Sequence, residues 1–111
     1  MTERVIDPHE AVDFLLRNAR KFSKAKAERV YLEEFRKSKV ALLMKQSHEK
    51  TLAGQERDAL AHPEYAELLE GIKESVKIEE ELRWHMVAAQ ARIDIYRSQE
   101  ATARMEMKAT V

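Results

Sequence analysis

The chain has 111 residues, 20 basic against 20 acidic side chains, and no cysteine. A chain of this length has room for one domain with a thin core, and the lack of cysteine excludes disulfides, thiolate metal ligands and cysteine nucleophiles. Only 2 Gly and 2 Pro stand against 36% charged residues, a composition typical of long helices and coiled coils. We therefore predict an all-α fold in a single helical domain over residues 1–111.

The first predicted helix runs from about residue 8 to about residue 47. Asp7 is placed to cap its free N–H groups, Pro8 suits its first position, and Glu10 stands where a capping-box acid belongs. At about 1.5 Å per residue, this helix would be about 60 Å long. Its apolar residues keep helical spacing and are Val12, Leu15, Leu16, Ala19, Phe22, Tyr31, Leu32, Phe35 and Leu42.

A short helix or corner is predicted over about residues 51–61, followed by a second long helix over about residues 63–107. Pro63 disfavours helical geometry at His62, so we expect a break there, with His62 placed to cap the helix that Pro63 begins. In this helix a seam with steps of three and four residues is apolar at ten of thirteen positions. Such a repeat predicts a left-handed supercoil or an antiparallel helical hairpin. The seam comprises Tyr65, Leu68, Ile72, Ser75, Glu79, Leu82, Met86, Ala89, Ile93, Tyr96, Glu100, Ala103 and Met107.

A second apolar stripe, Trp84, Ala88, Ala91 and Ile95, lies on another face of the same helix. Two apolar faces need two sets of neighbours, and large exposed apolar patches usually mark interfaces. We therefore expect a homo-oligomer; the alternative is a monomeric hairpin in which the long helices cover each other fully. The expected interface residues are Leu82, Trp84, Met86, Ile93, Ile95 and Tyr96.

Charge is distributed unevenly along the chain. Residues 17–50 carry eleven Lys or Arg against four acids, whereas residues 51–80 carry three against eight. Either the acidic segment folds onto the basic one, or the basic segment faces a polyanion such as nucleic acid. The candidate nucleic-acid-binding residues are Arg17, Arg20, Lys21, Lys24, Lys26, Arg29, Arg36, Lys37, Arg83, Arg97 and Arg104.

Aromatic side chains allow two interpretations. Phe22, Tyr31 and Trp84 offer stacking faces for unpaired bases. Aromatic residues at helical spacing most often pack, so we expect Phe22, Tyr31 and Tyr96 to lie in the core.

The sequence gives little evidence for a catalytic or metal-binding group of residues. The pair His48-Glu49 lacks a second histidine one helical turn on, where Leu52 stands. Consecutive carboxylates at residues 79–81 point in different directions around a helix and do not form a catalytic pair. We expect a non-enzymatic protein with no catalytic residue, no metal and no cofactor.

Residues 56–65, ERDALAHPEY, and residues 82–104, LRWHMVAAQARIDIYRSQEATAR, resemble a group of small helical proteins encoded by tailed phages, often near recombination genes. The likeness covers about the second half of the chain. More remotely, the order of a basic first helix, a short corner and a helical second half resembles the UvsY recombination mediators. Those proteins are oligomers without enzymatic activity that bind single-stranded DNA and help a recombinase displace single-strand-binding protein.

The resemblance implies an accessory protein for phage DNA recombination or replication, which binds single-stranded DNA and assists a recombinase. The alternative is a helical interaction module, a scaffold or inhibitor of a host protein, that binds no nucleic acid. The first ten residues lack the apolar core of a secretion signal and no run is long enough to cross a bilayer. We therefore expect a cytoplasmic protein, in a bacterial host cell, with no membrane partner.

Overall fold

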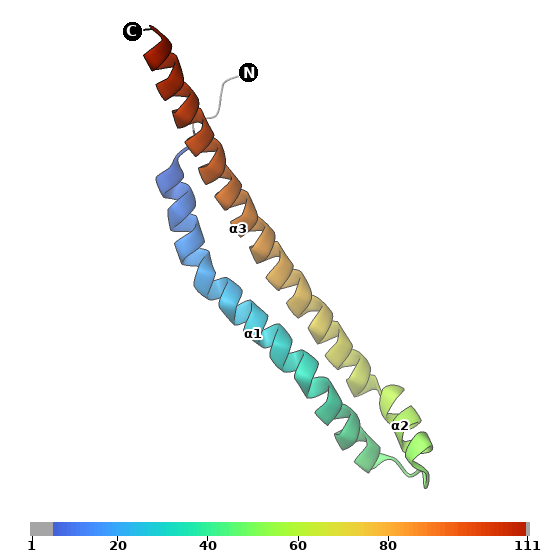
Figure 1. Cartoon of the computed structure of the whole chain (residues 1–111). Helices are drawn as coiled ribbons and strands as arrows, with labels where there is room; N and C mark the ends of the chain where they lie inside the picture. The colour runs from blue at the N-terminus through green and yellow to red at the C-terminus, as the bar shows by residue number, and fades with distance from the viewer. Residues whose placement is uncertain (1–5, 111) are drawn as a thin grey trace. The chain divides into compact units, whose positions relative to one another are not determined.

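The computed structural model describes residues 6–110 of the protein. Within that range there are three helices and no strand: α1 (Pro8–Gln46), α2 (Leu52–Leu60) and α3 (Pro63–Thr110) (Figure 1). The predicted all-α fold, with two long helices joined by a short one, is confirmed. The predicted ends differ from the observed ones by at most three residues, because caps and breaks are local features of the sequence.

The long helices begin at the side-chain caps that the sequence indicates. Asp7 Oδ1 accepts hydrogen bonds from the backbone N–H groups of His9 at 2.9 Å and Glu10 at 3.3 Å. At the start of α3, His62 Nδ1 accepts from the backbone N–H of Glu64 at 3.1 Å. Each cap satisfies N–H groups that have no partner within the helix.

The connection between the long helices is held by short-range polar contacts. The Thr51 hydroxyl caps α2 by accepting from the backbone N–H of Gly54 at 3.0 Å. The Ser47 hydroxyl donates to Asp58 Oδ2 at 2.5 Å, which fastens the end of α1 to α2. Gly54 therefore lies inside the short helix and does not interrupt it.

The contacts group the chain into two compact units. Residues 6–22 and 81–110 form one, here called the terminal unit, and residues 23–80 form the other, here called the hairpin unit. The prediction of a single domain over the whole chain stays a prediction.

In the hairpin unit the two long helices run antiparallel. Arg29 of α1 contacts Glu79 of α3, and further along α1 Lys39 contacts the earlier residue Glu64. Leu43 is the largest fully buried side chain described, with 2% of its surface exposed. The seam of α3 is half-buried or buried throughout this unit, so the predicted repeat marks the face that meets α1.

The terminal unit is also an antiparallel helix pair. The Phe14 ring lies at 64° to the His85 ring with centroids 6.4 Å apart, and residues 6–17, which include the start of α1, line a groove together with residues 85–92 of α3. Ala11 and Ala89 are the most buried apolar residues described in this unit. Small residues at these positions allow the backbones of the two helices to approach closely.

Candidate nucleic-acid and partner surfaces

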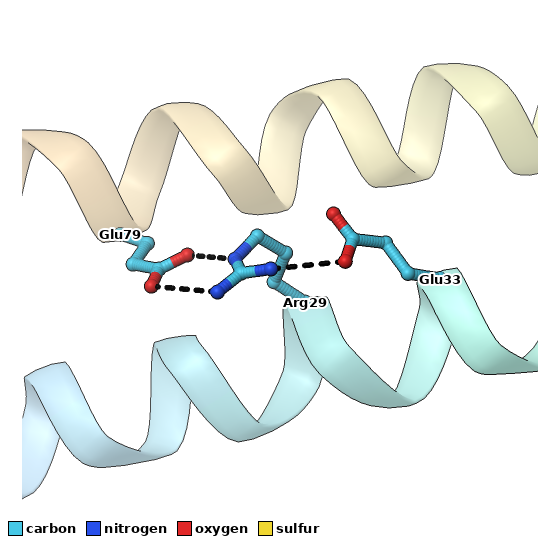
Figure 2. A network of polar contacts seen from close by, with 3 residues as sticks. All are labelled: Arg29, Glu33 and Glu79. Carbon is cyan, nitrogen blue, oxygen red and sulfur yellow. Dashed lines mark hydrogen bonds and ion pairs between the residues drawn. The ribbon is translucent and has the colours of Figure 1, made fainter.

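Arg29 lies at the centre of a polar network in the hairpin unit (Figure 2). Its Nε and Nη2 donate hydrogen bonds to the two carboxylate oxygens of Glu79, the second at 3.2 Å, and its Nη1 donates to Glu33 Oε2 at 2.9 Å. The hydrogen bonding of Arg29 to the Glu79 carboxylate is the main reason that the pKa of Arg29 is raised above its ordinary value, with a further contribution from Glu33. The guanidinium is therefore a permanent cation, and each of its three nitrogens already donates one hydrogen bond.

This network corrects the sequence assignment of Arg29. Sequence reasoning placed Arg29 in a cationic strip that faces nucleic acid, whereas its side chain points across the helix pair to a carboxylate on α3. Its partner Glu79 keeps only 7% of its surface exposed. We therefore remove Arg29 from the candidate nucleic-acid-binding residues.

The acidic and basic segments meet at two points in the hairpin unit. Besides the Arg29 pair, Lys39 Nζ lies 3.2 Å from Glu64 Oε2. Of the two explanations for the uneven charge, the folding of the acidic segment onto the basic one thus applies to these two cations. These two ion pairs do not account for the other basic residues of the basic segment.

The other ten candidate cations are exposed, but they do not share one face. Lys26 and Lys37 are separated by about three helical turns and lie on one flank of α1, whereas Lys24 lies on another. The exposed candidates of the hairpin unit are Lys24, Lys26, Arg36 and Lys37. Those of the terminal unit are Arg17, Arg20, Lys21, Arg83, Arg97 and Arg104.

A groove in the terminal unit contains one cation that sequence reasoning missed. Arg17, His85 and Arg92 line it together with the acidic residues Asp7 and Glu10. Arg83, Arg97 and Arg104 are separated by multiples of seven residues and so share one face of α3, whereas Arg92 does not fit this spacing. Only the pairing of α1 with α3 reveals the neighbours of Arg92. The mixture of both charges makes this groove a poor match for a polyanion alone.

Tyr31 is not a core residue, contrary to the expectation from its spacing. Its exposed fraction is 64%, and its ring stacks on Phe35 with centroids 6.2 Å apart and an angle of 9° between the planes. Phe22 and Tyr96, the other two aromatic residues expected in the core, are half-buried. The error has a physical cause: Tyr31 continues the apolar spacing of α1, but on the side turned away from α3.

Trp84 is the second exposed aromatic residue, with 58% of its surface accessible. The guanidinium carbon of Arg83 lies 4.6 Å from the centroid of its ring, a cation–π contact. Because the Arg83 charge covers this indole, Tyr31 is the more open of the two aromatic faces.

The six predicted interface residues divide between two faces of α3. Trp84 and Ile95 are exposed, whereas the other four are half-buried at seam positions. The half-buried four, which belong to the face that meets α1 in the terminal unit, are Leu82, Met86, Ile93 and Tyr96. Whether any of the six contacts a second chain stays a prediction.

Over residues 6–110 no group of three or more His, Asp or Glu side chains is arranged to hold a metal ion. In the same range no helix has both the length and the apolar character required to span a bilayer. No protein-family model, curated protein or solved structure shows a significant match to the chain.

Proposed function

We propose that the protein binds single-stranded DNA without catalysing a reaction, as an accessory factor for phage recombination or replication that assists a recombinase. The observation that carries this proposal is the exposed Tyr31 ring, stacked on Phe35 in the hairpin unit. Although Phe35 stacks against it, the Tyr31 ring stays largely accessible, and a flat aromatic face suits an unpaired base.

Lys24 supplies the nearest candidate phosphate contact on the same face of α1. It precedes Tyr31 by seven residues, or two helical turns, so the two side chains differ in direction by only about 20°. Glu28 and Glu34 lie about one turn on either side of Tyr31. Because Glu28 lies between Lys24 and Tyr31, these carboxylates repel phosphates at both ends of the ring, and we expect a modest affinity that falls as salt rises.

The mode of action would be positional. Stacking on Tyr31 and neutralisation by Lys24 would keep a strand extended and unpaired for loading of a recombinase. The likeness of the second half of the chain to phage proteins encoded near recombination genes supports this cellular role in a bacterial cytoplasm.

Fluorescence anisotropy with a labelled oligothymidine, measured over a salt series, tests the proposal. Tyr31→Ala should weaken binding by about tenfold, since each stacked base contributes about 1–3 kcal/mol, whereas Tyr31→Phe should retain most of the affinity. Lys24→Glu should also weaken binding and flatten the salt dependence. The matched control is Lys77→Glu, an exposed charge reversal on α3 of the same unit.

Two results would refute DNA binding. One is an absence of binding by the natural protein at low salt. The other is binding that responds equally to Lys24→Glu and to Lys77→Glu, because that would indicate only general charge attraction.

A second candidate function, a helical interaction module, is favoured by the exposed apolar stripe on α3. Exposed apolar surface of this kind is the usual anchor for a partner helix. Under this alternative Trp84→Ala abolishes partner binding, whereas charge reversal at Arg17, Lys21 and Lys24 leaves it intact.

A further inference from the structure

The outer face of α3 in the terminal unit carries an apolar stripe that its own unit leaves uncovered. Its members, here called the outer stripe, are all exposed, with 58% of Trp84 and 49% of Ile95 accessible. Most of it lies about half a turn around the helix from the seam, on the side turned away from α1, whereas Ala88 at its edge also lines the groove between α1 and α3. The outer stripe comprises Trp84, Val87, Ala88, Ala91 and Ile95.

The order of sizes along the outer stripe is self-complementary. Bulky residues stand at its ends, Trp84 at one and Ile95 at the other, and the small residues Ala88 and Ala91 lie between them. If two such stripes meet antiparallel about a point between residues 89 and 90, each Trp84 faces Ile95 of the second copy. Each Ala88 then faces Ala91, which allows the helix axes to approach to about 8 Å.

Charges beside the outer stripe select the same orientation. Arg83 and Asp94 lie on one flank of the stripe, near its two ends. In the antiparallel arrangement Arg83 of each copy lies beside Asp94 of the other copy, so the interface contains two such pairs of opposite charge. A parallel arrangement in register instead puts these flanks of the two copies on opposite sides of the interface, so that neither charge meets its opposite.

We propose that the outer stripe is a homodimer interface, in which the α3 helices of two copies pack antiparallel about the point between residues 89 and 90. The symmetry is that of an isologous interface, in which the same patch serves both subunits. Arg83, held over the Trp84 ring, fixes the indole that the second copy contacts. This inference is independent of DNA binding, because Tyr31 and Lys24 belong to the hairpin unit.

Single cysteines test the orientation, since the natural chain has none. Ala88→Cys and Ala91→Cys proteins, distinguished by a mass tag, are oxidised separately and as a mixture. The antiparallel interface predicts that the mixed disulfide forms faster than either disulfide between identical chains, because residues 88 and 91 face each other. Faster linkage between identical chains, or no linkage at all, would overturn the proposal.

Light scattering at several protein concentrations tests the interface itself. The natural protein should have twice the chain mass, and both Ile95→Asp and Trp84→Ala should weaken the dimer by about tenfold or more, as expected for the large apolar side chains that anchor an interface. Met107→Asp, an exposed apolar position of α3 outside the outer stripe, is the matched control and should leave the mass unchanged.

Circular dichroism distinguishes loss of the dimer from loss of the fold. Each variant should retain the helix content of the natural protein. A natural protein that stays monomeric at high concentration refutes the dimer. So does an Ile95→Asp protein that keeps the dimer mass. DNA binding is then measured separately on the same variants, and its loss or survival leaves this inference unchanged.

Discussion

Arg29 forms a two-pronged hydrogen-bonded ion pair with Glu79, fifty residues further along the chain, across the two helices of the hairpin unit. Both residues occupy the contact face of an antiparallel helix pair, where apolar side chains would be the default. Polar pairs in such seams can fix register and orientation, because a slipped pairing leaves a carboxylate without its cation. This is a candidate role for the Arg29–Glu79 pair in selecting one alignment of the helices.

We predict that removing one partner of this pair destabilises the protein more than removing both. Arg29→Met leaves the nearly buried Glu79 carboxylate without its main donor, whereas Arg29→Met with Glu79→Leu replaces the pair by apolar contact. Urea unfolding followed by circular dichroism should therefore give a lower midpoint for Arg29→Met than for the double variant. A double variant that unfolds at the same urea concentration as Arg29→Met would contradict the role of Glu79.

The Arg29 contribution to stability should not vary with pH near neutrality. The Glu79 hydrogen bond raises the pKa of Arg29, so its stabilisation is fully present below the ordinary pKa and lost only as pH rises through the higher folded value. Both values lie in strongly alkaline solution. The difference in urea midpoint between the natural protein and Arg29→Met should thus be equal at about pH 7 and about pH 9; a difference that shrinks markedly would show another titrating group at work.

Leu43 and its neighbour Leu42 provide a matched test of packing in the hairpin unit. Leu43 is 2% exposed and Leu42 is 50% exposed. Leu43→Ala should lower the free energy of unfolding by about 2–5 kcal/mol through lost burial and a cavity, and Leu42→Ala by about 1 kcal/mol or less. Equal losses in denaturant unfolding would contradict the assignment of the inner and outer faces of α1.

The two glycines should respond differently to replacement by alanine. A Cβ at Gly71, within α3, meets no heavy atom within 4 Å, so Gly71→Ala should stabilise by about 0.8–1 kcal/mol through helix propensity. A Cβ at Gly54 lies 3.0 Å from both Glu49 Cβ and the Thr51 hydroxyl. Gly54→Ala should therefore gain less or destabilise; thermal unfolding of the two variants compares them directly.

The cap of α2 should contribute measurably to stability. Thr51→Ala removes the hydroxyl that accepts from the Gly54 N–H and should cost about 1 kcal/mol. Thr51→Ser keeps that hydroxyl and serves as the control, with no loss of capping expected, because serine is at least as good an N-cap as threonine. Hydrogen exchange of the first amides of α2 should quicken in Thr51→Ala alone.

The sequence by itself determined where the helices begin and end. Asp7 caps α1, and His62 and Pro63 separate α2 from α3, because these effects act within about one turn of the backbone. Over residues 65–96 the three- and four-residue steps from Tyr65 also selected the half-buried and buried face of α3, whereas the last three seam positions, Glu100, Ala103 and Met107, are exposed.

The tertiary structure alone decided which side chains on α1 face a neighbour. Tyr31 and Arg29 both fit the patterns assigned to them, core and nucleic-acid contact, yet Tyr31 is exposed and Arg29 is paired with a carboxylate. Local spacing fixes the direction of a side chain around its own helix. Burial and pairing depend on which residue of a distant segment stands opposite, and that alignment is set by the packing of the helices together.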